Sequence, residues 1–175
     1  MWTKSAWMNV CIVVLLSATC LAAQGAHQCV RSTVAPNIEL RQDLDRVVTD
    51  LYNRSSSFKA QYDRLAAAQN LRVVVRLNHS LPSTCRALTR IWRRGREIRA
   101  DVQVPPSHAL VELLAHEFEH IVEQIEGLNL RKLSRIRGSG VRELDDDLFE
   151  SDRAIKAGRL VAEEANRQPK APAAD

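Results

Sequence analysis

The segment that most constrains the fold of this chain is an apolar run that ends in the pentapeptide HEFEH at residues 116–120. The run predicts a helix, and it consists of Ala109, Leu110, Val111, Leu113, Leu114 and Ala115. Residues four apart lie on one face of a helix, so His116 and His120 can present two imidazoles to one ion, with Glu117 beside them. The segment therefore predicts a helix that carries two metal ligands and a carboxylate.

These residue types suit hydrolytic zinc chemistry. Neutral imidazole is a strong zinc ligand, and two of them leave the ion enough charge to lower the pKa of a bound water toward neutrality. A carboxylate one residue after the first histidine can take the proton of that water and pass it to a leaving amine. We therefore predict one Zn²⁺ ion as cofactor, His116 and His120 as ligands, and Glu117 as the catalytic base. In the alternative, a charged helix carries two histidines four apart by chance.

The N-terminus is typical of a secretory signal peptide. Lys4 precedes an apolar stretch from about Val10 to Leu21, and small residues follow at Ala22, Ala23, Gly25 and Ala26. We predict a signal peptide over residues 1–25 and a secreted or periplasmic location. An uncleaved anchor remains the alternative, although the apolar core is shorter than the ~20 residues of a spanning helix. After cleavage we expect no stable membrane insertion.

Cleavage would leave two cysteines in the mature chain. Cys11 and Cys20 leave with the signal peptide, whereas Cys29 and Cys85 stay. Two cysteines in an oxidising compartment predict one disulfide, which would tie the mature N-terminus to the domain. Two separate thiols are the alternative.

The length of the chain limits the number of domains, and its charge limits the kinds of partner. About 150 mature residues suffice for one core, so we predict one domain over residues 26–166 and a disordered tail over 167–175. The net charge of +4 comes from 25 basic and 21 acidic residues. Basic clusters occur at 92–96, a predicted hairpin tip, and at 131–137. This mildly basic mixed surface does not require nucleic acid, and we expect no nucleic-acid partner.

Hydrophobic periodicity predicts an α+β domain with a small antiparallel or mixed sheet. Helices are expected over residues 37–52, 58–68 and 141–166, and strands over 71–77, 87–92 and 97–104. The helix that carries HEFEH is expected to begin at an N-cap, Ser107, and to end near Gly127.

Two histidines do not complete a catalytic zinc site, so a third protein ligand is expected. The metzincin arrangement is excluded because Glu123 and Glu126 stand where it needs Gly and His. Glu123 is read as a supporting or surface residue. Among the acidic residues of the last predicted helix, Glu150 is followed by small residues that allow two helices to approach closely, namely Ala154, Ala157 and Gly158. Glu143, with Asp147 four residues later, remains an alternative.

The HExxH motif and the stretch from Phe149 to Ala154 resemble the gluzincin-type zinc metallopeptidases, over about residues 95–162. The resemblance implies a zincin-like domain in which Glu150, on a C-terminal glutamate helix, completes the ligand set. It also implies hydrolysis of a peptide or protein substrate that lies along the strand at 97–104. The residue that stabilises the developing oxyanion is unassigned, and the candidates are His79, His108, Arg142 and Arg153.

Two other functional classes stay open. One is a zinc-binding envelope protein without catalytic turnover, although retention of Glu117 argues against a purely structural site. The other is a membrane- or envelope-interacting protein without a metal, in which the basic loops bind and HEFEH is incidental. The sequence leaves the oligomeric state open.

Overall fold

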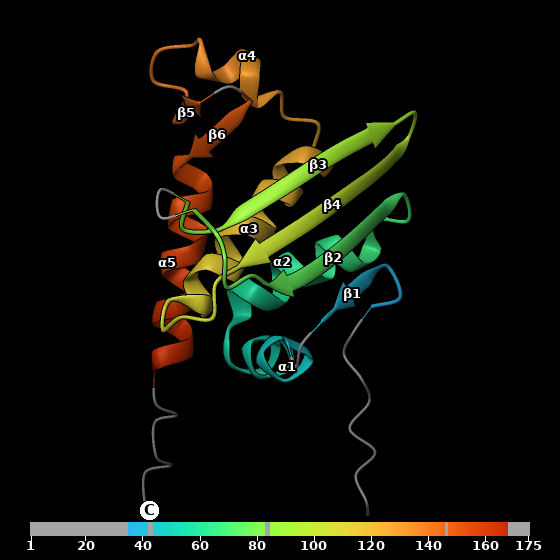
Figure 1. Ribbon diagram of the computed structural model, residues 1–175, viewed down its shortest axis with the longest axis vertical. Helices are drawn as coiled ribbons and strands as arrows, with labels where there is room; N and C mark the ends of the chain where they lie inside the picture. Colours follow the sequence, from blue (N-terminus) through green and yellow to red (C-terminus); the bar gives the residue numbers. More distant parts are fainter. Residues whose placement is uncertain (1–34, 42–43, 83–84, 146, 168–175) are drawn as a thin grey trace, which may run out of the picture. The chain divides into compact units, whose positions relative to one another are not determined.

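The fold is α+β, with a mixed sheet of four strands packed against helices and a separate two-stranded hairpin (Figure 1). The computed structural model describes residues 35–41, 44–82, 85–145 and 147–167. All of them belong to one unit, Ser32–Asp175. The predicted signal peptide and residues 168–175 of the predicted tail lie outside the described residues, so those boundaries stay predictions.

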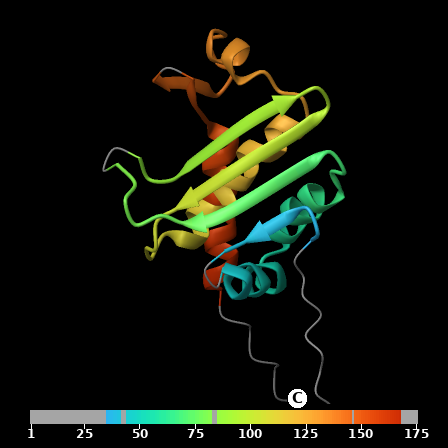
Figure 2. The same ribbon diagram turned by 45° about the vertical axis from the view of Figure 1, so that its right-hand side comes forward.

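The sheet has the strand order β1-β2-β4-β3, and Figure 2 shows the four strands side by side. Its strands are β1 (Ile38–Leu40), β2 (Leu71–Leu77), β3 (Leu88–Arg94) and β4 (Glu97–Val104). β1, β2 and β4 are parallel, whereas β3 and β4 form an antiparallel hairpin. The hairpin turns at Gly95, whose φ of +60° suits a residue without a side chain. β3 is therefore an edge strand.

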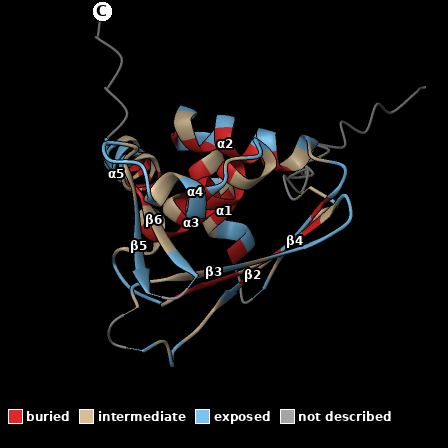
Figure 3. Cartoon of the chain, turned by 90° about the horizontal axis from the view of Figure 1, so that it is seen from above, coloured by how far each residue is buried: buried red, intermediate tan, exposed pale blue. Residues whose placement is uncertain are grey.

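The helices lie on one side of this sheet (Figure 3). They are α1 (Leu44–Arg54), α2 (Ser56–Ala67), α3 (Leu110–Ile125) and α5 (Asp152–Asn166), with a short α4 (Leu130–Ser134) after α3. β2 and β4 alternate, so that Val73, Val75 and Val102 are buried in the core while Arg72 and Arg99 are exposed on the other face. Among the described residues, no helix could cross a membrane.

The predicted helix over 37–52 is wrong at its start. Residues 38–40 form β1, and α1 begins only at Leu44. Ile38 is buried and pairs with Val73 of β2, so its backbone bonds to a strand instead of a helical turn. Two apolar residues, Ile38 and Leu40, are too few to define a period, and the long-range pairing makes this segment a strand.

The predicted helix over 141–166 is also wrong at its start. Residues 141–151 form a hairpin of β5 (Val141–Asp145) and β6 (Leu148–Ser151), and α5 begins at Asp152. Asp147 has a φ of 63°, which permits the reversal, and the Ser151 side chain accepts a hydrogen bond from Ala154 N and so caps α5. Glu150 consequently lies on β6, not on the C-terminal helix.

Two smaller predictions fail. Ser107 does not cap α3, whose N-cap is Ala109 without a side-chain hydrogen bond. β4 lies between β2 and β3, so both of its edges are already paired and no peptide can add to residues 97–104. The predictions of β2, of a second helix close to α2, and of the end of α3 before Gly127 at φ +79° are confirmed.

Candidate metal centre

α3 brings the two histidines of HEFEH to one side of the helix. The ring centroids of His116 and His120 are 4.9 Å apart, and the rings meet edge-on. The opposite side of α3 is apolar and buried, and Phe118 stacks on Phe58 of α2 at 5.7 Å. The packing of that apolar side fixes which way the histidines point.

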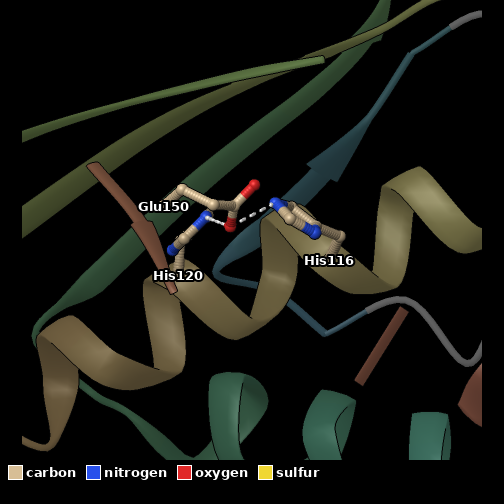
Figure 4. A group of neighbouring side chains, drawn as sticks. All are labelled: His116, His120 and Glu150. Carbon is tan, nitrogen blue, oxygen red and sulfur yellow. Dashed lines mark ion pairs between the residues drawn. The ribbon is translucent and has the colours of Figure 1, made fainter. Parts of the chain in front are cut away.

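β6 supplies the third member of the group, Glu150 (Figure 4). Its Oε1 lies 3.4 Å from His116 Nε2 and 3.7 Å from His120 Nε2, and the three ligand atoms lie within 4.8 Å of one another. An ion with tetrahedral bonds of about 2.0–2.1 Å separates its ligand atoms by about 3.3 Å. The group could therefore hold a metal ion with small adjustments.

Close packing of α5 against α3 supports this arrangement. A Cβ added to Gly158 would lie 2.7 Å from the backbone oxygen of Glu112 and 3.2 Å from His116 Cβ. Ala154, one turn earlier, is fully buried. The small residues therefore do permit the close helix approach that the sequence predicts, although Glu150 itself precedes α5.

A buried hydrogen-bond chain orients His120. His120 Nδ1 lies 3.0 Å from Glu123 Oε2, and Ser151 Oγ donates to Glu123 Oε1 at 2.6 Å. When Nδ1–H donates to Glu123, the lone pair of Nε2 is directed toward Glu150 and the site. Burial lowers the pKa of His120, but the hydrogen bond to Glu123 and nearby carboxylates raise it overall. The side chain of Glu123 is only 1 % exposed. Of the two roles predicted for it from the sequence, a supporting residue or a surface residue, the structure fits the supporting one.

Burial shifts the pKa of His116, a partly buried member of the group, and that of Glu117, which is buried beside it. Burial, with smaller contributions from His120 and Arg86, lowers the pKa of His116 to about 4, so its imidazole is neutral at pH 7 and free to bind a metal. Burial raises the pKa of Glu117, which is 5 % exposed. His120 and the Thr89 hydroxyl oppose that rise.

A cavity of about 720 Å³ opens onto these side chains. β3 lines one side of it through Thr89 and Ile91, and the β5–β6 hairpin lines another through Leu148 and Phe149. His116, Glu117, His120 and Glu150 lie on its wall together. Outside this group, both apolar residues and polar ones such as Arg86, Arg93 and Gln124 line the cavity, which is large enough for several side chains of a ligand.

The structure does not bring the sequence-predicted oxyanion candidates to the cavity. His79 and His108 are exposed, and neither lines it. Arg142 pairs with Asp152 at 3.5 Å, and Arg153 binds Glu119 and Glu126. The alternative ligand Glu143 is exposed on β5 and lies outside the group.

Sequence reasoning missed two residues on the cavity wall, Arg86 and Thr89. Arg86 stands in the loop before β3 and lies 3.5 Å from Glu112 of α3. No motif marks either residue, because only the folded sheet brings them to α3. Cys85 also lines the cavity, and its Sγ lies 2.8 Å from Ala87 O. Its predicted partner Cys29 lies outside the described residues, so the disulfide stays a prediction.

The chain was compared with protein-family models, curated proteins and solved structures, and it matches none of them.

Proposed function

We propose that this protein is a zinc metallopeptidase with a zincin-like site, in which His116, His120 and Glu150 bind one Zn²⁺ ion and Glu117 is the catalytic base. One observation carries the proposal: the buried carboxylate of Glu117 lies 4.0 Å from His116 Nε2, next to a group of three ligands, on the wall of an open cavity. A carboxylate at this place is superfluous for a structural site and required for hydrolysis.

The donor set favours zinc. Two imidazoles and one carboxylate form a common ligand set of catalytic zinc, whereas magnesium and calcium prefer oxygen ligands alone. Among the described residues, the group contains three ligands rather than the four of a closed structural site. A bound zinc would act as a Lewis acid toward the scissile carbonyl and would increase the acidity of water.

The residues of the chain then divide the work of hydrolysis. Glu117 accepts a proton from the attacking water, whose oxygen bonds to the carbonyl carbon, and it delivers that proton to the amide nitrogen as the C–N bond breaks. Glu123 holds His120 in the tautomer that keeps Nε2 unprotonated. Arg86 lies on the cavity wall, and its charge helps to lower the pKa of His116, which favours the neutral imidazole.

The substrate pose follows from the sheet. β3 has β4 on one side and no second strand among the described residues, so its free edge can pair with an extended peptide. Thr89 and Ile91 of the same strand line the cavity, which places such a peptide beside the group. The proposal includes secretion or a periplasmic location, which rests on the signal-like residues 1–25.

The test uses the full chain with stoichiometric zinc. We expect about one equivalent of bound zinc and hydrolysis of members of a broad peptide library. Glu117→Gln is expected to keep the zinc and to lower the hydrolysis rate by about 10²–10⁴-fold. Glu163→Gln, an exposed change of the same kind on α5, is expected to leave both unchanged. Bound zinc without hydrolysis in any of the three proteins favours a zinc-binding protein without turnover, and no bound zinc overturns both readings.

A further inference from the structure

The face of the sheet opposite the helices carries arginines and one exposed tryptophan. Trp92 is 52 % exposed, and it is the only aromatic among the exposed large hydrophobic residues of the described chain. We define the arginine face as Trp92 together with the outward residues Arg72, Arg90, Arg94 and Arg99. A shallow hollow of about 830 Å³ is lined by four of these five residues, together with the carboxylates of Glu39, Glu97 and Asp101.

The strand register gathers these side chains. Trp92 of β3 is opposite Arg99 of β4, which is opposite Arg72 of β2, so the three residues form one row across the sheet. Neighbours in such a row have Cβ atoms about 4.5–5.5 Å apart. Arg90 and Arg94 lie two residues to either side of Trp92 and therefore point to the same face.

Part of the positive charge on this face is not neutralised. Arg99 pairs with Glu97 at 3.0 Å, but within the described ranges no carboxylate pairs with Arg72, Arg90 or Arg94. The other carboxylates of the hollow, Glu39 and Asp101, pair with Arg41 and Arg76. The three unpaired cations beside an exposed indole ring therefore make this surface complementary to closely spaced anions.

We propose that the arginine face docks on the surface of an anionic phospholipid bilayer. Guanidinium groups match phosphate in shape and charge, and tryptophan favours the boundary between headgroups and acyl chains. The signal peptide predicted over residues 1–25 would also direct the chain to a membrane before cleavage. Single-stranded nucleic acid fits less well, because such surfaces stack successive bases on several aromatic rings and this face offers one.

This proposal does not depend on hydrolysis. The arginine face and the metal cavity lie on opposite sides of β3, since Thr89 and Ile91 line the cavity while Arg90 and Trp92 point outward. A failure of either proposal leaves the other standing.

The experiment follows the environment of Trp92 in the full chain. Trp2→Phe and Trp7→Phe make Trp92 the sole tryptophan, so attachment through the N-terminal segment does not produce the signal. Vesicles of phosphatidylcholine alone are compared with vesicles that also contain phosphatidylglycerol and a quencher lipid. With the anionic vesicles, we expect a blue shift and quenching of Trp92 fluorescence that high salt reverses.

Arg90→Glu with Arg94→Glu is the decisive variant. Loss of two cations is expected to weaken binding to the anionic vesicles by about 30-fold or more. The control replaces Arg46 and Arg159, two exposed arginines on α1 and α5, by Glu, and it makes the same change in net charge. Equal loss in both double variants, or an unchanged Trp92 spectrum on anionic vesicles, overturns the proposal. Quenching by a single-stranded RNA homopolymer but not by vesicles overturns it in favour of a nucleic-acid surface. Circular dichroism checks that each variant is folded.

Discussion

The two ring nitrogens of His120 have different partners. Nε2 is directed toward Glu150, and Nδ1 donates to the buried carboxylate of Glu123. Glu123 is itself held by Ser151, the residue that follows Glu150 and caps α5. Ser151 thus holds the carboxylate that supports His120, caps α5, and directly follows Glu150 in the chain.

Replacement of Glu123 by Gln should therefore weaken metal binding without removing a ligand. The variant keeps the size of the side chain but loses the charge that fixes the tautomer of His120, and such partners typically contribute 10–100-fold to metal affinity. Competition with a chromogenic chelator should show zinc affinity reduced by about that factor. Glu163→Gln, an exposed site on α5, should bind zinc as the wild type does. Equal affinity in the two variants would show that Glu123 has no role in binding.

At the scale of elements, α3 and α5 approach so closely that a methyl group does not fit between them. Alanine at an ordinary helical position stabilises a helix by roughly 0.5–1 kcal/mol relative to glycine. At Gly158 the added Cβ would instead meet a backbone oxygen at 2.7 Å, which cannot rotate away. Gly158→Ala should lower the free energy of unfolding by about 1–3 kcal/mol in urea denaturation. Lys156→Ala, exposed on the same helix, should change it by less than about 0.5 kcal/mol.

α5 also stabilises the start of α2 through Glu164. Its carboxylate accepts hydrogen bonds from Ser55 Oγ at 2.6 Å and from Ser57 N at 3.0 Å. Burial raises the pKa of Glu164, but the hydrogen bonds together lower it by more, so the net shift of the pKa is downward. A carboxylate with a lowered pKa stabilises the fold above its unfolded pKa, about 4.3, and loses this effect as pH falls through the folded value.

Glu164→Gln should accordingly destabilise the protein at pH 7 and much less at pH 3. Urea denaturation of both proteins at the two pH values measures the difference. The exposed neighbour Glu163→Gln controls for the change in net charge and should show little difference at pH 7. A wild-type advantage that is the same at both pH values would mean that the charge of Glu164 does not matter.

The sequence predicted those elements whose signal is local. β4 alternates polar and apolar residues, β2 is rich in β-branched residues, and the apolar side of α3 repeats at helical spacing, so their own residues suffice. β1 has only three residues and exists because β2 pairs with it. Residues 141–151 are rich in charged side chains that suit a helix, and only the turn at Asp147 and the cap at Ser151 make them a hairpin.

In the candidate site, too, some residues could be predicted from the local sequence and others could not. His116, Glu117 and His120 lie within one pentapeptide, so their residue types and spacing alone predict that they act together. Glu150 was selected for the small residues that follow it, and the structure does bring it to the histidines, from a strand rather than from a helix. Arg86 and Thr89 reach the cavity only through the placement of β3 beside α3, which no local pattern encodes.

At the scale of the whole molecule, β3 connects the metal cavity with the arginine face. Its inward residues line the metal cavity, and its outward residues belong to the arginine face. If both proposals hold, a bilayer bound to the outer face would lie along the strand whose free edge receives the peptide. Extended segments close to a membrane surface would then be the substrates most easily reached.

A metal ion would also connect elements that are otherwise loosely joined. The β5–β6 hairpin has exposed apolar residues, Leu144 at 60 % and Leu148 at 38 %, so it should open more readily than the core strand β2. If Glu150 is a ligand, opening the hairpin releases the ion. Zinc at 100 times its Kd should then slow hydrogen exchange in residues 141–151 by about 100-fold, as much as in β2. Glu150→Ala should abolish the effect in the hairpin. Slowing in β2 with no change in the wild-type hairpin would show that the histidines bind zinc without Glu150.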